Sequence, residues 1–409
     1  MKNRFLLLLF MASAIISSAQ GPEVTSWVIN TTGQVGYLGI LSNVQTVQYT
    51  TTDVYVSCTC IPGYDIGPWA GNPNTPSNQN FCYKITRNPA ENTGTKTATA
   101  LGHIGVWSNG VSIFNAKDAF SYNNQGIWNQ DAIPNEGASF DDCLGHPAPN
   151  GEYHHHVNPT CLYDDMDSLQ HSPIIGYAFD GFPIYGAYGY ANTDGTGGIK
   201  RMETSYSLRN ITTRTTLPDG TVLSAGQYGP NVSATYPLGK YIEDYEYISG
   251  QGDLDEYNGR FCVTPDYPAG IYAYFVTIDG NLNPVYPYTI GAYYYGTVQT
   301  GNTGPGSGHN TVPGGAVTYN PSTSVETINS NENISLYPNP SEGFFRIQLF
   351  NISENYSVVM YDANGKMVWN KKSCTDITDV DVTGFSTGMY LVNIITDSGF
   401  QFSERVMKR

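Results

Sequence analysis

Apolar and polar positions alternate over short stretches along most of this 409-residue chain, and a period of two is typical of β-strands. Between residues 20 and 296, runs of β-branched and aromatic residues predict strands within 44–56, 174–179 and 271–278. Helical spacing of apolar residues is rare, and residues 115–122 form the best short helix candidate. The pattern therefore predicts a mainly β protein.

Residues 332–409 show the same alternation in a series of short segments. The turn sequences Asn364-Gly365 and Asp397-Ser398-Gly399 separate neighbouring segments and favour hairpins. Several short strands in a region of this length predict a small β-sandwich. The predicted strands lie at 345–350, 356–361, 367–369, 389–396 and 400–406.

The start of the chain and the stretch before the sandwich differ from these strand-forming regions. Residues 1–19 combine two basic residues, an apolar run and a final Ser-Ser-Ala, which predicts a signal peptide. The apolar run is shorter than the roughly 20 residues that a membrane anchor requires. Residues 297–331 are rich in Gly, Thr, Ser, Asn and Pro and predict a flexible linker, in which His309 is exposed. We therefore expect an exported chain with a β-rich body at residues 20–296.

The charge of the chain limits its partners. It carries 19 Lys and Arg against 35 Asp and Glu, a formal net charge of −16 at pH 7. An acidic chain without a basic patch repels phosphate backbones, so we expect no nucleic-acid binding and disfavour an anionic membrane surface. Cations are the favoured class of ligand.

The seven cysteines indicate disulfides, because an exported chain folds in an oxidising compartment. Cys374 lies alone in the predicted sandwich, which leaves an even set of six in the body. Fifteen pairings of six cysteines exist, and the sequence does not choose among them. Cys143 and Cys161 bracket a histidine-rich segment, so we expect them to close that loop. The other candidates are Cys58, Cys60, Cys82 and Cys262.

The histidine-rich segment is the strongest candidate for chemistry. On a strand, His154 and His156 point to one face and His155 to the other, so the spaced pair can reach one divalent metal ion. His146 and His171 are the candidates to complete three or four ligands. Neutral imidazole nitrogens suit copper or zinc, and a nearby carboxylate can add an oxygen. Alternatively, these histidines only donate structural hydrogen bonds, and His155 is a surface residue.

Two further residues are candidates for supporting the ligands. Asp180 precedes a Gly and a Pro, where its carboxylate either caps a tight turn or orients a ligand histidine by accepting its second N–H. The turn alone is the favoured role. Tyr153, directly before the spaced histidine pair, is the second such candidate.

Three ordered motifs in the predicted sandwich resemble the type A C-terminal sorting domain of the type IX secretion system. They are Ser335–Pro340, Met360–Lys366 and Ser386–Val392. The resemblance implies an immunoglobulin-like sandwich at residues 332–409 that the outer-membrane secretion machinery recognises. It also implies that the body is secreted or attached to the outer-membrane surface.

Five ordered motifs in the body resemble the YHYH domain family over about residues 100–280. The motif that names the family, Tyr-His-Tyr-His, occurs here as Tyr153-His154-His155-His156, so its third position differs. The changed position is the one that points away from the spaced pair, which is therefore kept. The resemblance names the domain and implies no activity. The motifs are Asn109–Phe114, Gly145–Pro147, Gly151–His156, Ile175–Gly186, and Asn258–Phe261 with Tyr267–Tyr274.

The sequence thus predicts a secreted or surface-attached protein with a mainly β, disulfide-containing body and a β-sandwich sorting domain. We expect the body to bind copper or zinc through its histidines. An alternative is a surface adhesin or glycan-binding module, in which exposed tyrosines contact polysaccharide and the histidines are structural. No nucleophile elbow, zinc-protease helix or phosphate-binding loop is present, so the sequence leaves enzymatic activity open.

Overall fold

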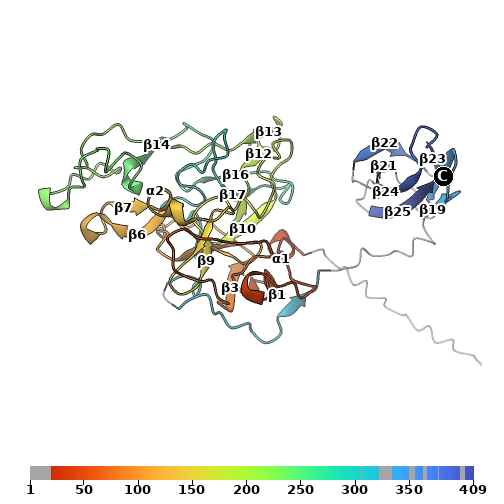
Figure 1. The fold of residues 1–409 in the computed structure, drawn as a ribbon. Coiled ribbons are helices and arrows are strands. Elements are labelled where there is room, and N and C mark those ends of the chain that lie inside the picture. The colour runs from red at the N-terminus through yellow and green to blue at the C-terminus, as the bar shows by residue number, and fades with distance from the viewer. Residues whose placement is uncertain are drawn as a thin grey trace, which may run out of the picture. The chain divides into compact units, whose positions relative to one another are not determined.

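A computed structural model describes residues 20–304, 306–321, 334–349, 355–362, 366–375, 377–396 and 401–409. The chain divides into two compact units, Met1–Pro321 and Ser322–Arg409 (Figure 1). The predicted signal peptide and the two predicted hairpin turns of the sandwich lie outside the described residues. Among the described residues, every helix is too short or too polar to cross a membrane.

The centre of the first unit is an eight-stranded sheet in the order β16-β17-β11-β10-β4-β5-β9-β8. Neighbouring strands are antiparallel, except for the parallel pairs β5–β9 and β11–β17. Every residue of β4 and β10 is buried, so both faces of the sheet are covered there, which explains their continuous apolar runs. The strands are β4 (His103–Trp107), β5 (Ser112–Phe114), β8 (Gly145–Pro147), β9 (Tyr153–His155), β10 (Ile174–Ala178), β11 (Pro183–Tyr185), β16 (Gly259–Cys262) and β17 (Ile271–Phe275).

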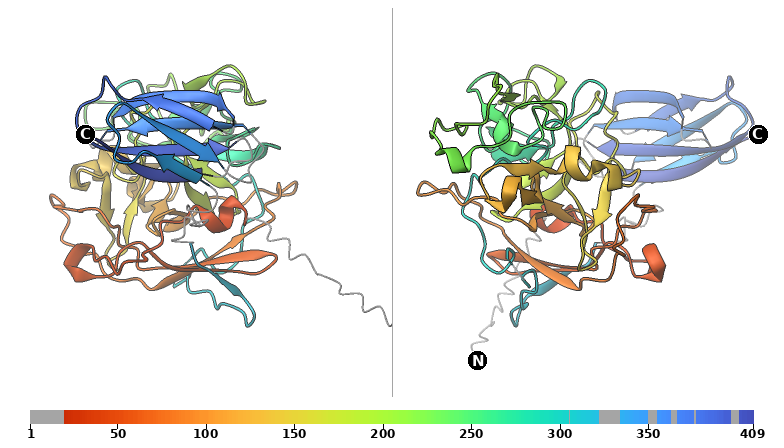
Figure 2. Two further views of the ribbon diagram at one scale, coloured as in Figure 1. Left: turned by 90° about the vertical axis from the view of Figure 1, so that its right-hand side faces the viewer. Right: turned by 60° about the vertical axis from the view of Figure 1, so that its left-hand side comes forward.

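A second, four-stranded sheet shares the hydrophobic core of the central sheet. Its order is β18-β1-β2-β3, and Figure 2 shows its long strands below the central sheet. The predicted strand region 44–56 is thus confirmed, but a turn divides it into two strands. The strands are β1 (Val44–Tyr49), β2 (Asp53–Cys58), β3 (Phe81–Thr86) and β18 (Val317–Tyr319).

Part of the segment predicted as a linker pairs with the body. Strand β18 lies within residues 297–331, yet it pairs with β1. Asn302 bonds to the backbone of Lys84, and His309 bonds to the Asn80 carbonyl. Backbone pairing does not depend on apolar side chains, so a Gly- and Thr-rich segment can extend a sheet edge without showing a strand pattern. Residues 297–321 therefore belong to the body.

Short hairpins and helical turns make up much of the rest of the first unit. The expected helix at 115–122 is wrong: this region contains β6, which pairs with β7. The hairpin strands are β6 (Lys117–Ser121), β7 (Asn129–Asp131), β12 (Tyr188–Tyr190), β13 (Ile199–Arg201), β14 (Tyr206–Leu208) and β15 (Tyr245–Tyr247). The helices are α1 (Pro22–Thr25) and α2 (Ala132–Glu136), with 3₁₀ turns η1 (Tyr37–Gly39), η2 (Tyr122–Asn124), η3 (Gly137–Ser139), η4 (Ala225–Gln227) and η5 (Ile242–Asp244).

The predicted disulfide between Cys143 and Cys161 is confirmed. The other body cysteines, Cys58, Cys60, Cys82 and Cys262, are unpaired in the structure, in contrast to the expectation that all six pair. Cys58 lies opposite Phe81 and Cys82 lies opposite Ser57, so the two cysteines point to opposite faces of their sheet. They cannot bond without a change of register.

Most tyrosines of the body lie in its hydrophobic clusters or pack against them. Tyr83, Tyr177 and Tyr274 are fully buried, whereas Tyr293 is 49% exposed. Several buried hydroxyls have partners; Tyr294, for example, donates to the Ile104 carbonyl. The structure thus accounts for the abundance of tyrosine by packing.

The second unit is an immunoglobulin-like β-sandwich of two antiparallel sheets, β19-β20-β23 and β22-β21-β24-β25. Alternate residues of β21 and β24 face a shared apolar core. The predicted strands are confirmed, and β19 and β23 were not foreseen. The strands are β19 (Ile334–Tyr337), β20 (Phe344–Leu349), β21 (Tyr356–Tyr361), β22 (Met367–Cys374), β23 (Ile377–Asp381), β24 (Gly388–Thr396) and β25 (Gln401–Lys408).

Candidate metal centre

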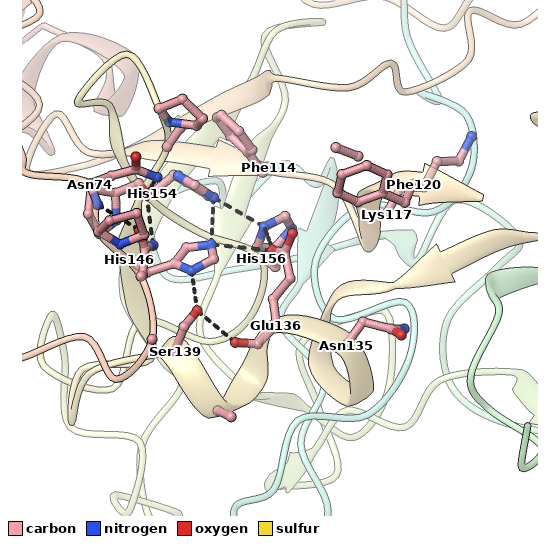
Figure 3. Close-up of a pocket in the computed structure, with 18 of the residues that line it drawn as sticks. Asn74, Phe114, Lys117, Phe120, Asn135, Glu136, Ser139, His146, His154 and His156 are labelled. Atoms are coloured by element: carbon pink, nitrogen blue, oxygen red, sulfur yellow. Dashed lines mark hydrogen bonds and ion pairs between the residues drawn. The ribbon is translucent and has the colours of Figure 1, made fainter. Parts of the chain in front are cut away.

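Three histidines meet at the edge of the central sheet. His146 on β8 and His154 on β9 are direct antiparallel partners, and His156 follows two residues later. The Nε2 atom of His154 lies 3.1 Å from Nε2 of His146 and 3.1 Å from Nε2 of His156. All three side chains are buried. The strand argument from the sequence therefore identified residues that the fold brings together, as Figure 3 shows.

The outer nitrogens of two histidines are fixed by backbone carbonyls. Nδ1 of His154 lies 3.1 Å from the carbonyl oxygen of Glu152, and Nδ1 of His156 lies 2.6 Å from that of Asn115. A carbonyl oxygen only accepts, so each Nδ1 carries the hydrogen. In a neutral imidazole the Nε2 atom then has a free lone pair. Both lone pairs point into the cluster.

His146 is fixed in the same way by a side chain. Its Nδ1 lies 2.8 Å from the hydroxyl oxygen of Ser139, which is also 2.8 Å from the Glu136 carbonyl oxygen. The single hydroxyl hydrogen goes to the carbonyl, so the Ser139 oxygen accepts a hydrogen from His146 Nδ1. The Nε2 atom of His146 is therefore a third unprotonated nitrogen in the cluster.

This arrangement can hold a metal ion. Two ligands at the roughly 2.0–2.1 Å zinc–nitrogen distance and a tetrahedral angle are about 3.3 Å apart, close to the spacing observed here. Burial lowers the pKa of His154 well below its usual range, and protonation of His156 or His146 would lower it further. His154 therefore stays neutral, the form that binds metal.

Glu136 completes the cluster on the side of α2. Its Oε2 atom lies 3.4 Å from Nε2 of His146 and 3.3 Å from Nε2 of His156. Burial opposes its ionisation, but the pKa of Glu136 lies well below the usual range, because its carboxylate accepts hydrogen bonds from His146 and His156 whenever these rings are protonated. Glu136 thus offers a carboxylate oxygen beside the three nitrogens. Sequence reasoning missed it, because α2 has only five residues and leaves no periodic signal.

Tyr153 supports the cluster through Asp141. Its hydroxyl donates to Asp141, whose carboxylate also accepts from the backbone N–H groups of Cys143 and Gly145. Gly145 directly precedes His146 on β8. Tyr153 therefore contacts none of the ligand nitrogens but helps to anchor the strand that carries His146.

His171 and Asp180 lie outside the cluster. Nδ1 of His171 lies 2.7 Å from the Ser172 carbonyl oxygen, and its ring contacts aromatic side chains around Tyr185. Asp180 accepts hydrogen bonds from the Tyr274 hydroxyl and from the backbone N–H groups of Phe182 and Gly296. The favoured turn-capping role of Asp180 agrees with these contacts, and none of them involves a histidine of the cluster.

The remaining histidines of the segment and its surroundings are also buried. His155 is fully buried rather than a surface residue, because the face of β9 opposite the cluster packs against the core near Trp107. Within the described residues neither of its ring nitrogens has a hydrogen-bond partner. His103 bonds to Glu152 at 2.8 Å and to Ser307 at 3.0 Å, which accounts for it without a metal.

A cavity of about 680 Å³ opens onto the cluster (Figure 3). His146, His154, His156 and Glu136 form its inner end. The Phe114 ring stacks on the His154 ring, with centroids 3.8 Å apart. The wall is largely apolar and includes Leu101, Phe114, Ala119, Phe120, Ala138 and Pro147.

The fold and the site define a mainly β protein with a buried histidine cluster that opens into a cavity. The family model described as YHYH protein matches residues 82–286, half of the chain, and the chain belongs to this family. The cluster lies within the matched range. A second model, the secretion system C-terminal sorting domain, matches residues 335–409. This domain indicates a secreted or cell-surface protein that interacts with the type IX secretion machinery.

Solved structures add little to this assignment. One similar structure is an immunoglobulin-like β-sandwich protein from Bacteroides vulgatus, 12% identical, which covers 20% of this chain and 88% of that chain with a TM-score of 0.18. Another is PorZ, a surface component of the type IX secretion system of Porphyromonas gingivalis, 10% identical over 90% of this chain and 51% of that chain, also at 0.18. No curated protein matches the sequence.

Proposed function

We propose that this protein binds a transition-metal ion, copper or zinc, through His146, His154 and His156 outside the cell. In this proposal residues 1–19 direct export, residues 20–321 form the metal-binding body, and residues 332–409 serve secretion. The mature body is released or stays attached to the outer-membrane surface. His171, considered from the sequence as a fourth ligand, is left out because it lies elsewhere in the fold.

The observation that carries the proposal is the common orientation of the three rings. Each Nδ1 atom is held by an outer acceptor, and the three Nε2 atoms converge. The Nε2 atom of His154 lies 3.1 Å from each of the other two, and lone pairs this close repel one another unless a cation lies between them. Histidines that serve only as structural donors have no reason to converge in this way.

The chemistry of the donor set favours copper or zinc. Imidazole nitrogens suit these ions, which stand at or near the top of the affinity order for divalent metals of the first row. Glu136 offers an oxygen as a further ligand or as an acceptor for a bound water. A bound ion of this kind supplies Lewis acidity at a position that faces the cavity.

The direct test is the metal content of the secreted chain, purified without chelator and measured by element-resolved mass spectrometry. We expect close to one equivalent of copper or zinc per chain. The double variant His154→Ala, His156→Ala is expected to lose it while circular dichroism reports an intact fold. His309→Ala, which removes an exposed histidine far along the sequence, is the matched control and keeps the metal.

A chain that is metal-free as purified and takes up neither ion at micromolar concentration would contradict the proposal. Polysaccharide binding by that metal-free chain, retained in the double variant, would favour the adhesin alternative. The cluster would then be a buried structural feature only.

A further inference from the structure

We propose that the cavity above the histidine cluster binds a small neutral molecule with an apolar body and one oxygen donor, the class to which simple phenols belong. The inference rests on the proposed metal site and names the ligand class of that site. In it, the oxygen reaches the metal ion held by the histidines, and the apolar body fills the cavity.

The size of the cavity sets the first limit. A volume of about 680 Å³ lies within the range of roughly 300–1,000 Å³ that is typical of small-molecule sites. A single-ring molecule fits with room to spare, whereas a folded protein partner cannot reach the buried histidines. The inner end therefore selects a small molecule.

The mouth of the cavity exposes apolar side chains. Phe120 is 61% exposed and Leu101 is 52% exposed, and both line the cavity. A ligand with an apolar body would cover them, and removing apolar surface from water is favourable. The Phe114 ring lies against His154 further inside and continues the apolar wall towards the cluster.

Several side-chain amides of the wall already donate to backbone carbonyls. The side-chain amides of Asn72 and Asn74 both donate to the Pro147 carbonyl, and that of Asn135 donates to the Asp131 carbonyl. A sugar, with a hydroxyl on nearly every carbon, would find few free partners and would lose hydrogen bonds to water. The wall thus disfavours polyhydroxylated ligands and leaves the metal as the main polar contact.

The side-chain charges around the cavity disfavour an anionic group on the body of the ligand, away from the metal ion. Glu136 is the one carboxylate among the described lining residues, and Lys117 is the one Lys or Arg. Figure 3 shows the Lys117 side chain extending away from the histidines, so its ammonium does not face the metal site. The chain as a whole carries a net charge of −16. Once the ligand oxygen occupies the metal ion, a carboxylate elsewhere on the ligand would find no cationic side chain beside the metal site.

The test uses the full secreted chain loaded with cobalt(II), whose visible absorption reports a new ligand on the ion. It is titrated with p-cresol, which is neutral at pH 7, and with 4-hydroxybenzoate, which has the same ring and hydroxyl group but carries a carboxylate. We expect p-cresol to change the spectrum saturably and with at least tenfold higher affinity than 4-hydroxybenzoate. Glucose is expected to leave the spectrum unchanged.

Two variants test whether the ligand binds in the cavity. Phe120→Ala is expected to weaken p-cresol binding roughly five- to tenfold, because it removes apolar surface that the ligand would cover. Phe261→Ala is the matched control, since Phe261 is 63% exposed and does not line the cavity, and it leaves the affinity unchanged. Both side chains are exposed, so neither variant disturbs the core.

The outcomes separate this inference from the metal proposal. If cobalt binds at one equivalent and p-cresol leaves its spectrum unchanged, the inference is overturned and the metal site stands. Equal affinity for p-cresol and 4-hydroxybenzoate likewise overturns it. If no metal binds at all, the elemental measurement shows that the underlying metal proposal has failed.

Discussion

The hydroxyl oxygen of Ser139 lies 2.8 Å from Nδ1 of His146, and the hydroxyl hydrogen goes to the Glu136 carbonyl. Ser139 therefore decides which nitrogen of His146 carries the proton. Its position at the end of η3, directly after α2, couples the backbone next to Glu136 to the orientation of His146. This short helical segment therefore positions the Glu136 carboxylate and also orients the His146 ring.

Removing that hydroxyl tests whether the orientation matters. Ser139→Ala leaves His146 Nδ1 without its acceptor, so the ring is free to rotate or to take the other tautomer. We expect the affinity for copper or zinc to fall roughly 10- to 100-fold, the usual effect of losing a partner behind a metal ligand. A competition titration against a chelator of known affinity measures this.

The matched control for this prediction is Ser168→Ala, which removes an exposed hydroxyl outside the site. It is expected to leave the metal affinity unchanged. Unchanged affinity in Ser139→Ala would show that His146 is held in place by its strand alone.

The Cys143–Cys161 disulfide closes a loop that contains all three histidines of the cluster. Replacing both cysteines by alanine releases a loop with a sequence separation of 18. We expect the free energy of unfolding of the metal-free chain to fall by about 3 kcal/mol, because the unfolded chain regains the entropy of the open loop. Denaturant unfolding followed by tryptophan fluorescence measures the change.

Cys82→Ala is the control for the disulfide variant, because Cys82 is unpaired and only partly buried. Cys82→Ala is expected to lower the free energy of unfolding clearly less than the double replacement does. Equal losses in the two variants would mean that cysteine packing, and not the cross-link, stabilises this region.

His155 gives a prediction about pH. Burial lowers its pKa to about 3, with further contributions from the charges of His146 and His156. The folded chain then keeps His155 neutral while the unfolded chain takes up a proton below the ordinary histidine pKa near 6.5. The contribution of this group to the free energy of unfolding is therefore constant above about pH 6.5 and falls as the pH drops towards 3.

His155→Leu removes the loss of stability at low pH that comes from protonation of His155 in the unfolded chain. It also removes two ring nitrogens that have no partner among the described residues. Below pH 6.5, the stability difference between variant and wild type is expected to shift in favour of the variant by up to about 1.4 kcal/mol per pH unit. Buried acids with raised pKa values, such as Asp131 and Asp180, occur in both chains, so they cancel in the difference. Urea unfolding of the metal-free chains at pH 7, 6 and 5 measures the difference in unfolding free energy between variant and wild type. A difference that does not change with pH would contradict the prediction.

The sequence by itself determined the fold class and the candidate ligands. Alternation of apolar and polar positions reports which face of a strand is buried, and this is a local property. It placed β10, β17 and most strands of the sandwich. The same period of two placed His154 and His156 on one face, and the spacing of Cys143 and Cys161 around that segment indicated their disulfide.

Only the tertiary structure decided which other residues join the histidine pair. His146 was the candidate third ligand and His171 the candidate fourth, and the antiparallel pairing of β8 with β9 brings only His146 of these two into the cluster. Glu136 and Ser139 enter from short helical segments without a periodic pattern. His155 is buried because the core covers the second face of β9, and β18 joins the body by backbone pairing with β1. Some of these contacts join residues that are distant in sequence, and others are made by the backbone. The pattern of apolar and polar side chains along the chain predicts neither kind of contact.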